Sequence, residues 1–408
     1  MGGLSMEWKE VTLGDFMQCN PKRTIKKGQK ARKITMDLLI PHSKTIRNWN
    51  YEPYSGGAKF QNGDTIMARI TPCLENGKHA FVSILDEGEI AYGSTEYFVF
   101  CGKEKVSDND FVYYLTKTPL FRDTAIKSMV GSSGRQRAQM DVLENLKMFV
   151  PKDISDQRRI ASILSSLDRK IELNNKINAD LEEMAQAIFK NWFVDFEPFK
   201  DGKFVDSELG MIPEGWKVGC LGDMGAVVCG KTPSKSNSNY YGGDIPFIKI
   251  PDMHGNVFVE NSEDRLTEEG SLSQIKKFIP PYSLMVSCIA TVGLVSINTK
   301  PSHTNQQINT VIPHNKSALF YLYQYIKNNE ELLKNMGRGG TTTLNVNTRS
   351  FSNIRLLIPS EIALEQFHRV VEGLFKKIEL NLHESRTLSL LRDTLLPRLM
   401  SGELEVPE

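Results

Sequence analysis

One stretch of this sequence resembles a phosphate-binding loop. Residues Gly225–Thr232 read GAVVCGKT and fit the pattern GxxxxGK[ST], in which backbone N–H groups and a lysine hold nucleotide phosphates. That chemistry requires a helix directly after the lysine, so that its N-terminus points at phosphate. Here Pro233 and a polar run without apolar helical period follow. Lys231 and Thr232 are therefore interpreted as loop donors to a phosphate group, such as one of DNA. A nucleotide-binding enzyme is the alternative, and ATP binding lost on Lys231→Ala would support it.

Other candidate binding residues are arginines, amides and hydroxyls in predicted loops or at strand ends. Such side chains bond base edges and phosphates, although ordinary polar surface residues are the alternative. They cluster in the late loop GSSGRQR, in the run HTNQQIN and in the late loop GRGGTTT. The candidates are Arg69, Lys78, Arg135, Gln136, Arg137, Asn305, Gln306, Gln307, Arg338, Thr341 and Thr342.

A basic run lies near the N-terminus, between Asn20 and Thr35. It holds seven Lys and Arg residues and no acidic residue, so it is either a solvated loop or a phosphate contact. No catalytic or metal-binding residues are predicted, because the seven histidines are scattered and the six cysteines show no metal-ligand spacing. The N-P-P-aromatic motif of amino-methyltransferases and the dinucleotide glycine fingerprint are also absent.

Composition indicates a globular protein of two or more domains. The chain has 408 residues, 40% of them hydrophobic, with 50 basic and 49 acidic residues. Isolated cysteines suit a reducing cytoplasm, the expected location. No run approaches about 18 apolar residues, so no membrane span is expected.

The chain repeats itself. Trp8-Lys9 before Leu13-Gly14-Asp15 recurs with the same spacing as Trp216-Lys217 before Leu221-Gly222-Asp223, at an offset of 208 (216 − 8). Each copy contains short strand-like runs bounded by Gly, Pro and Asn, together with helical stretches. The fold class is therefore predicted as α+β, with two pseudo-repeated mixed α/β domains whose loops differ. In the first copy, Leu143–Val150 is predicted as a final strand.

A long helix is predicted after each copy, because apolar residues recur in alternating steps of four and three. Ser155 is expected to cap the first helix and Pro397 to end the second near Leu396. Each seam has two polar central positions, which would fix the register. The alternative is two solvated amphipathic helices on separate domains. The seam residues are Ile160, Leu164, Leu167, Ile171, Asn174, Asn178, Leu181 and Ile188 in one helix, and Phe367, Val371, Leu374, Ile378, Asn381, Ser385, Leu388 and Leu395 in the other.

These segments carry a family resemblance. DQRRIASILSSLDRKIELNNKINADLEEMAQAIFKNWFVDFEPF followed by LGMIPEGWKV resembles the central conserved region of type I restriction–modification specificity subunits. IPSEIALEQF followed by LLPRLMSGEL resembles their distal conserved region. One departure is Arg392, which stands where the central helix has Ala185, and looser packing is expected there.

The resemblance implies an architecture and a set of partners. Recognition domains at residues 1–151 and 198–360, the second with a linker at 198–215, would each read half of a split DNA site. Spacer helices at 152–197 and 361–408 would pack as an antiparallel coiled coil, and their length would set the spacing of the half-sites. The partners would be double-stranded DNA, two methylation subunits and two restriction subunits. S-adenosylmethionine, ATP and Mg would be bound by those subunits, and this chain would be non-catalytic. A coiled-coil scaffold with carbohydrate- or protein-binding heads stays open as an alternative; a DNA affinity that is modest and independent of salt would favour it.

Overall fold

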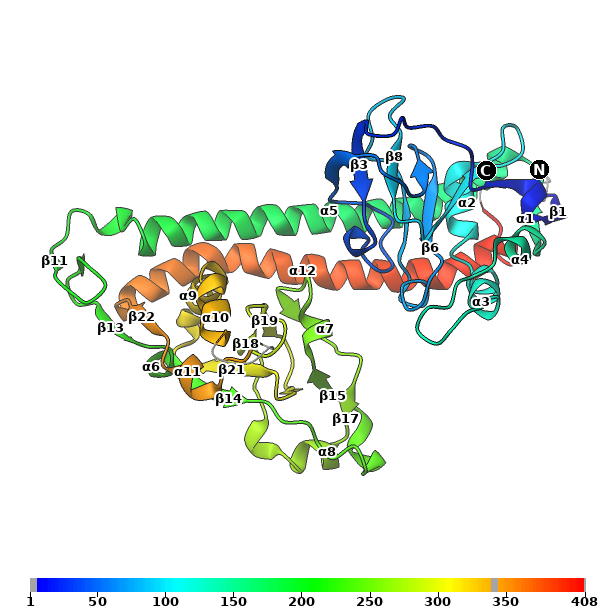
Figure 1. Ribbon diagram of the computed structural model, residues 1–408. Helices are drawn as coiled ribbons and strands as arrows, with labels where there is room; N and C mark the ends of the chain where they lie inside the picture. Colours follow the sequence, from blue (N-terminus) through cyan, green and yellow to red (C-terminus); the bar gives the residue numbers. More distant parts are fainter. Residues whose placement is uncertain (1–5, 339–343, 407–408) are drawn as a thin grey trace, which may run out of the picture. The chain divides into compact units, whose positions relative to one another are not determined.

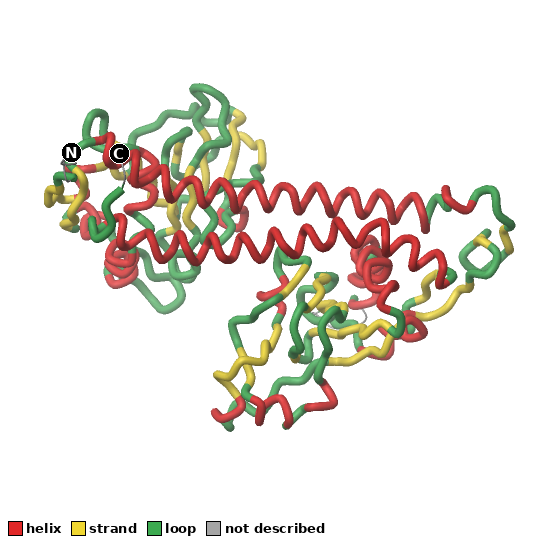
Figure 2. Tube along the Cα trace, turned by 180° about the vertical axis from the view of Figure 1, so that it is seen from behind, coloured by secondary structure: helices red, strands yellow, loops and turns green. Residues whose placement is uncertain are grey.

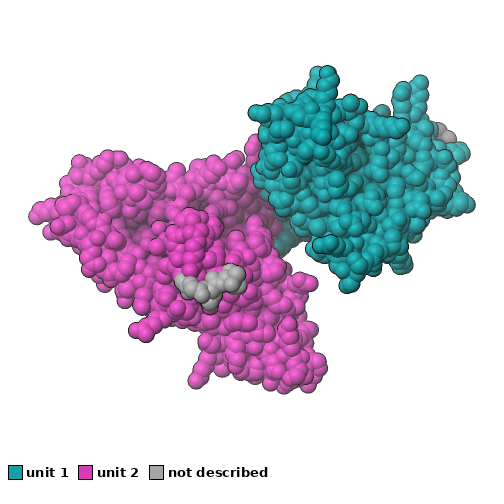
Figure 3. Space-filling model, viewed as in Figure 1, with its two compact units in different colours: residues 1–173, 385–408 teal, residues 174–384 magenta. Residues whose placement is uncertain are grey.

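The computed structural model describes residues 6–338 and 344–406 (Figure 1). Its contacts divide the chain into two compact units, coloured separately in Figure 3. Unit 1 comprises Met1–Leu173 and Ser385–Glu408, and unit 2 comprises Asn174–Glu384. Each unit contains a mixed α/β domain and a part of each of two long helices, so the predicted mixture of helices and sheets is confirmed.

The two long helices have the same length. Helices α5 (Ile154–Phe193) and α12 (Glu361–Met400) are each 40 residues long, or about 60 Å, and they are the longest red segments of Figure 2. Two predicted boundaries are wrong. Ser155 lies inside the first turn of α5, and α12 continues through Pro397. Burial of the residues around that proline explains the continuation, because Leu396, Leu399 and Met400 all lie in the unit 1 core. Within the described ranges, none of the helices combines the length and the apolarity that crossing a membrane requires.

Unit 1 contains a two-stranded sheet, β1-β10, and two four-stranded sheets, ordered β2-β9-β6-β7 and β4-β3-β8-β5. The predicted strand at Leu143–Val150 is partly wrong, since its first residues belong to a short helix. The elements are β1 (Trp8–Thr12), α1 (Leu13–Phe16), β2 (Met17–Cys19), β3 (Lys30–Ile34), η1 (Met36–Leu38), β4 (Asn50–Pro53), β5 (Lys59–Phe60), β6 (Thr65–Ala68), β7 (His79–Phe81), β8 (Ala91–Gly93), β9 (Tyr97–Gly102), α2 (Asn109–Leu115), α3 (Pro119–Lys127), α4 (Met140–Glu144) and β10 (Lys147–Pro151).

Unit 2 contains a five-stranded sheet, β14-β21-β18-β19-β16, a three-stranded sheet, β17-β15-β20, and the pairs β13-β22 and β11-β12. The elements are η2 (Glu197–Phe199), β11 (Phe204–Val205), β12 (Ile212–Pro213), β13 (Lys217–Cys220), α6 (Leu221–Met224), β14 (Gly225–Cys229), η3 (Ser238–Tyr240), β15 (Tyr241–Ile248), α7 (Ile250–Met253), β16 (Phe258–Val259), β17 (Arg265–Leu266), α8 (Glu268–Leu272), η4 (Ile275–Lys277), β18 (Leu284–Ser287), β19 (Val295–Asn298), β20 (His303–Thr304), β21 (Ile308–Pro313), η5 (Lys316–Ala318), α9 (Leu319–Asn328), α10 (Glu330–Gly337), α11 (Thr348–Ser352) and β22 (Arg355–Ile358).

The sequence repeat appears as a repeat of strand register. In unit 1, Lys9 of β1 lies opposite Val150 of β10. In unit 2, Lys217 of β13 lies opposite Ile358 of β22, which is the same pairing at the same offset in both strands. The parallel pair β3·β8 likewise corresponds to β15·β20. The predicted internal repeat is therefore confirmed down to individual strand pairs.

In unit 1 the two long helices share the domain core and a buried ion pair. Ile160 and Leu164 of α5 lie in one apolar cluster with Leu396 of α12. Nearby, Arg392 Nη1 donates to Asp168 Oδ1 at 2.6 Å, and both side chains are buried. The expectation of loose packing at Arg392 is wrong, because the Arg392 side chain is buried and its guanidinium pairs with Asp168.

In unit 2 the helices contact through amides at one end and aromatic rings at the other. Asn174 Nδ2 donates to Glu384 Oε2, and Asn381 Nδ2 donates to Asn178 Oδ1, both at 2.8 Å. Further along α5, Phe189 contacts Phe367. Because partner numbers fall along α12 as they rise along α5, the helices run in opposite directions within this unit. Buried polar positions of this kind disfavour shifted registers.

The buried face of each helix is wider than a simple heptad seam. All predicted seam residues are buried or half-buried, but Phe189 and Phe375 are more buried than their predicted neighbours Ile188 and Leu374. A straight helix drifts by about 20° per heptad, and each helix here also packs against its own domain. In unit 2 that second contact is aromatic, with Phe375 stacked on Phe320 at 4.1 Å between ring centroids.

Candidate nucleic-acid interface

Three loops of unit 1 are tied together by backbone hydrogen bonds at the end of β6. We call them the first loop cluster; they are residues 69–71, residues 94–96 and residues 131–138. Arg69 N donates to Glu96 O at 2.9 Å, and Ala138 N donates to Arg69 O at 2.8 Å. Thr71 N donates to Gln136 O at 3.0 Å. The predicted residues Arg69, Arg135, Gln136 and Arg137 therefore lie in one place.

Charged side chains of the first loop cluster gather on one carboxylate. Arg137 donates to Glu96 from Nε at 3.0 Å and from Nη2 at 2.7 Å. Arg69 Nε lies 3.9 Å from the same carboxylate, and its guanidinium lies over the Phe98 ring. The hydrogen bond from Arg137 lowers the pKa of Glu96, and the same bond raises the pKa of Arg137. The group is therefore charged throughout the physiological pH range.

The remaining unit 1 candidates differ in how they are held. Lys78 lies next to the first loop cluster, because its carbonyl accepts a hydrogen bond from the N–H of Ala68, the residue before Arg69. Its ammonium donates to the carbonyl of Met36 at 2.6 Å, so it is part of the domain structure. Arg135 is exposed, and Gln136 is half-buried.

The same frame of hydrogen bonds occurs in unit 2 with different side chains. We call the corresponding segments, residues 288–290, 305–307 and 344–346, the second loop cluster. Cys288 N donates to Gln307 O and Val346 N to Cys288 O, both at 2.8 Å. Ala290 N donates to Leu344 O at 3.0 Å. Each bond has its counterpart in unit 1, so Cys288 corresponds to Arg69 and Gln307 corresponds to Glu96.

The predicted residues of the phosphate-loop match and of the amide run come together here. Lys231 N donates to Thr304 O at 2.9 Å, and Thr232 Oγ1 donates to Gln306 Oε1 at 2.7 Å. The Lys231 and Gln306 side chains are exposed. Asn305 is buried and donates from Nδ2 to Gln307 Oε1 at 2.9 Å.

The last predicted loop is only partly described. Arg338 is exposed, and its Nη1 donates to Asn335 Oδ1 at 2.6 Å. Thr341 and Thr342 lie outside the described residues.

Sequence reasoning missed Ser94, Thr95 and Glu96. In the structure Glu96 N donates to Ser94 Oγ at 3.1 Å, just as Gln307 N donates to Asn305 Oδ1 at 3.2 Å. The two turns are equivalent although Ser-Thr-Glu and Asn-Gln-Gln share no residue. The available signal was position, since each turn lies directly before a buried strand of the repeat, β9 or β21.

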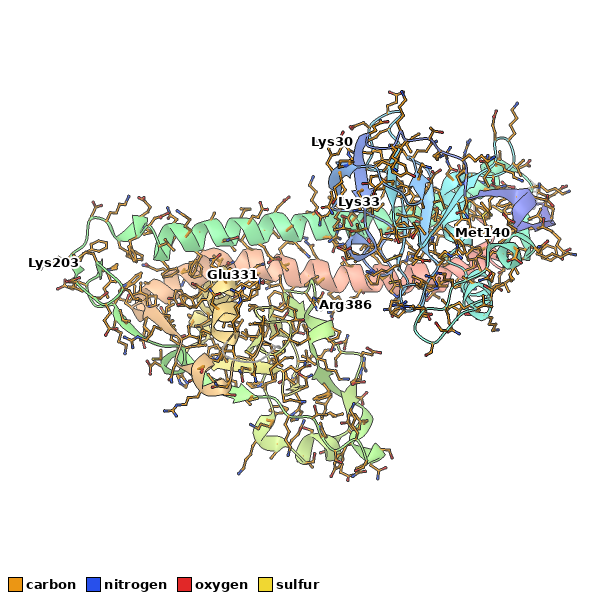
Figure 4. All side chains as sticks on the ribbon, viewed as in Figure 1. Lys30, Lys33, Met140, Lys203, Glu331 and Arg386 are labelled. Carbon is orange, nitrogen blue, oxygen red and sulfur yellow. The ribbon has the colours of Figure 1, made fainter. Side chains whose placement is uncertain are left out.

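Part of the basic run between Asn20 and Thr35 is used inside the domain. Arg23 pairs with buried Asp64 at 2.7 Å, and Arg32 pairs with Asp86 at 2.9 Å. Lys30 and Lys33 lie on β3 (Figure 4), and Lys33 pairs with Glu52 at 2.7 Å. These ion pairs show that part of the run supports local structure.

The geometry around Gly225–Thr232 is unlike a nucleotide-binding loop. Its first five residues form strand β14, which pairs with β21. The next helical turn after Thr232 is the three-residue η3, which begins at Ser238. No helix N-terminus therefore follows Lys231 directly. Among the described residues, no group of three or more His, Cys, Asp or Glu side chains is arranged to hold a metal ion.

We expect His303, two residues before Asn305 of the second loop cluster, to make unit 2 less stable in acid. Burial lowers the pKa of His303 to about 4, and its Nε2 lies 2.8 Å from Ser271 Oγ. The unfolded chain binds this proton near pH 6.5. Stability from His303 is therefore complete above about pH 6.5 and falls as the pH drops toward 4, by up to about 3 kcal/mol.

Denaturant unfolding at several pH values would measure this effect. His303→Gln keeps a hydrogen-bonding group near Ser271 and removes the titration, so its curve is expected to be flatter than that of the wild type between pH 6.5 and 4.5. Parallel curves for the two proteins would contradict the assignment to His303.

Comparisons with known proteins find similarity over most of the chain. The family model described as "Type I restriction modification DNA specificity domain" matches residues 6–183 and 213–388. The type I restriction enzyme HindI specificity subunit of Haemophilus influenzae is 34% identical, over 98% of this chain and 100% of that protein. The MjaIX specificity subunit of Methanocaldococcus jannaschii is 30% identical over 74% of this chain and 70% of that one. A solved type I restriction-modification S subunit from M. genitalium covers 100% of this chain and 98% of its own, with a TM-score of 0.53 and 13% identity, so that likeness is one of fold.

Proposed function

Because the chain belongs to the family of type I restriction–modification DNA specificity domains, we propose that it reads a split, asymmetric DNA site with one recognition domain for each half. The observation that carries this proposal is the frame shared by the two loop clusters. The backbone arrangement is the same in both, while the side chains are ionic in the first and amide in the second. Two such clusters in one chain fit recognition of two different half-sites.

The long helices have a second role in this proposal. We infer that α5 and α12 act together as an antiparallel coiled coil that sets the spacing between half-sites, and that two methylation subunits and two restriction subunits assemble on the chain. Contacts inside each unit, such as Asp168 with Arg392 and Asn178 with Asn381, support the pairing.

The chemistry of this system is proposed to lie in the partner subunits. S-adenosylmethionine, ATP and Mg would be bound there, and the methylation subunits would flip an adenine out of the duplex for N6 methylation. This chain would select the DNA sequence at which the complex acts.

The test is to express this chain with its methylation subunits and map methylated adenines in the host genome. We expect one asymmetric site, made of two specified halves separated by a fixed number of unspecified base pairs. Omission of this chain should abolish the methylation. A single continuous site, or the same methylation without this chain, would contradict the proposal.

A further inference from the structure

One position of the shared frame carries a carboxylate in the first half and an amide in the second. The geometry points to Glu96 as a positioning residue that fixes the Arg137 guanidinium so that Arg137 selects a guanine in the first half-site. This inference rests on the proposed function, which it deepens by naming the residues that set one base preference.

The hydrogen bonds of Arg137 leave a defined part of its guanidinium available. An arginine has five N–H donors. Here Nε and one N–H of Nη2 face Glu96, and one N–H of Nη1 faces the Arg135 carbonyl at 3.2 Å. One donor thus remains on each terminal nitrogen. Such a pair matches the O6 and N7 acceptors of guanine in the major groove.

Exposure and neighbouring charge fit the same role. The Arg137 side chain is 41% exposed, whereas the Glu96 side chain is 23% exposed, so the carboxylate lies below the guanidinium that it holds. Arg69 also lies near Glu96, with its Nε 3.9 Å from Glu96 Oε2 and its guanidinium over the Phe98 ring. Its positive charge disfavours any movement of Arg137 toward Phe98. The Arg137 side chain is therefore restricted before DNA arrives, which lowers the entropy cost of binding.

The ion pair is not needed to hold the loops together. In unit 2 the equivalent segments form the same three backbone bonds although Gln307 replaces Glu96 and Asn345 stands at the place of Arg137. A partly exposed ion pair of this kind also contributes only about 1 kcal/mol or less to stability. The pairing of Glu96 with Arg137 is therefore better explained by recognition than by folding.

The experiment uses the complex with methylation subunits and a DNA library randomised over the first half-site. Glu96→Gln, Arg137→Lys and Arg137→Ala are compared with the wild type, and Glu96→Asp tests rescue by a conservative change. We expect the first three to reduce the preference for guanine at one base position by roughly tenfold or more, with the second half-site unchanged. Glu96→Asp should retain most of the preference. The matched variant Gln307→Glu should leave the first half-site unchanged.

Three outcomes would overturn the inference. If Arg137→Ala weakens binding equally for all sequences and lowers the salt dependence by about one phosphate contact, Arg137 binds the backbone instead. If Arg137→Ala alters a base preference but Glu96→Gln does not, Glu96 has no positioning role. If the wild type shows two specified half-sites and none of the variants changes a base preference, this inference fails and the proposed function stands. A wild-type complex without a split site overturns the proposed function itself.

Discussion

Replacing residues 1–150 with the corresponding segment of the Haemophilus influenzae relative is expected to change one half of the methylated site and leave the other half unchanged. The first loop cluster lies entirely inside the exchanged segment, and the second lies entirely outside it. The preferred base sequence of the first half should follow the donor. Mapping of methylated adenines in hosts that express the chimera with its methylation subunits would measure this.

The junction of this chimera can be chosen from the structure. Gln157 of α5 is buried, and its amide donates to the carbonyls of Val106 and Pro151 at 3.1 Å. Its Oε1 accepts from Asp108 N at 2.9 Å. All three partners are backbone groups, so a grafted domain can supply those of Val106 and Asp108 whatever its side chains. A change in both half-sites would contradict the assignment of one domain to each half.

Arg392→Ala is expected to destabilise unit 1 by about 3–5 kcal/mol, because it leaves Asp168 buried without its counter-ion. Burial by itself would lower the pKa of Arg392, but the hydrogen bonds and charges of Asp393 and Asp168 raise it overall. Tyr114 donates to the other oxygen of Asp168 at 2.6 Å, so the carboxylate is held by the domain as well as by the helix. Denaturant unfolding of the full chain, followed by a probe in unit 1, would measure the loss.

Arg398→Ala is the matched control for this prediction. Arg398 lies on the same helix and pairs with Glu403 at 2.8 Å, but both side chains are exposed. Its loss should cost at most about 1 kcal/mol. Joint replacement of Asp168 and Arg392 by leucine should recover much of the stability, since it leaves neither member of the pair as an unpaired buried charge, and Asp393, the other partner of Arg392, is exposed. Equal losses in the free energy of unfolding for Arg392→Ala and Arg398→Ala would show that burial of the Asp168–Arg392 pair does not increase its contribution to stability.

The sequence was most informative where the signal repeats along the chain. The steps of four and three predict α5 and α12 because a helix places such residues on one face. The recurring Trp-Lys and Leu-Gly-Asp segments predict two similar domains, since both copies must build the same strand pairs. Asn178 and Asn381 could also be placed in a helix contact from their positions in the seam.

The candidate site was less predictable, because its contacts join residues far apart in the sequence. Glu96 binds Arg137 across 41 positions, and no local pattern marks the pair. The same is true outside the site, where Asp168 binds Arg392 across 224 positions. Glu96 was also hidden because its turn shares no residue with the equivalent turn at Asn305. Pro397 was misjudged for a related reason, since the core that keeps α12 helical beyond it comes from the other end of the chain.

The loop clusters are joined by main-chain groups, and this has a consequence for how such a protein changes over generations. Every residue except proline carries both a peptide N–H and a C=O, so we expect that residues such as Glu96, Arg137 and Gln307 can be exchanged while the scaffold that presents them still folds. Under the proposed function, mutations in one loop cluster would change one half-site and leave the other half-site unchanged. A lineage would then acquire a new recognition sequence through a few substitutions in one loop cluster, and selection would act on each half-site separately.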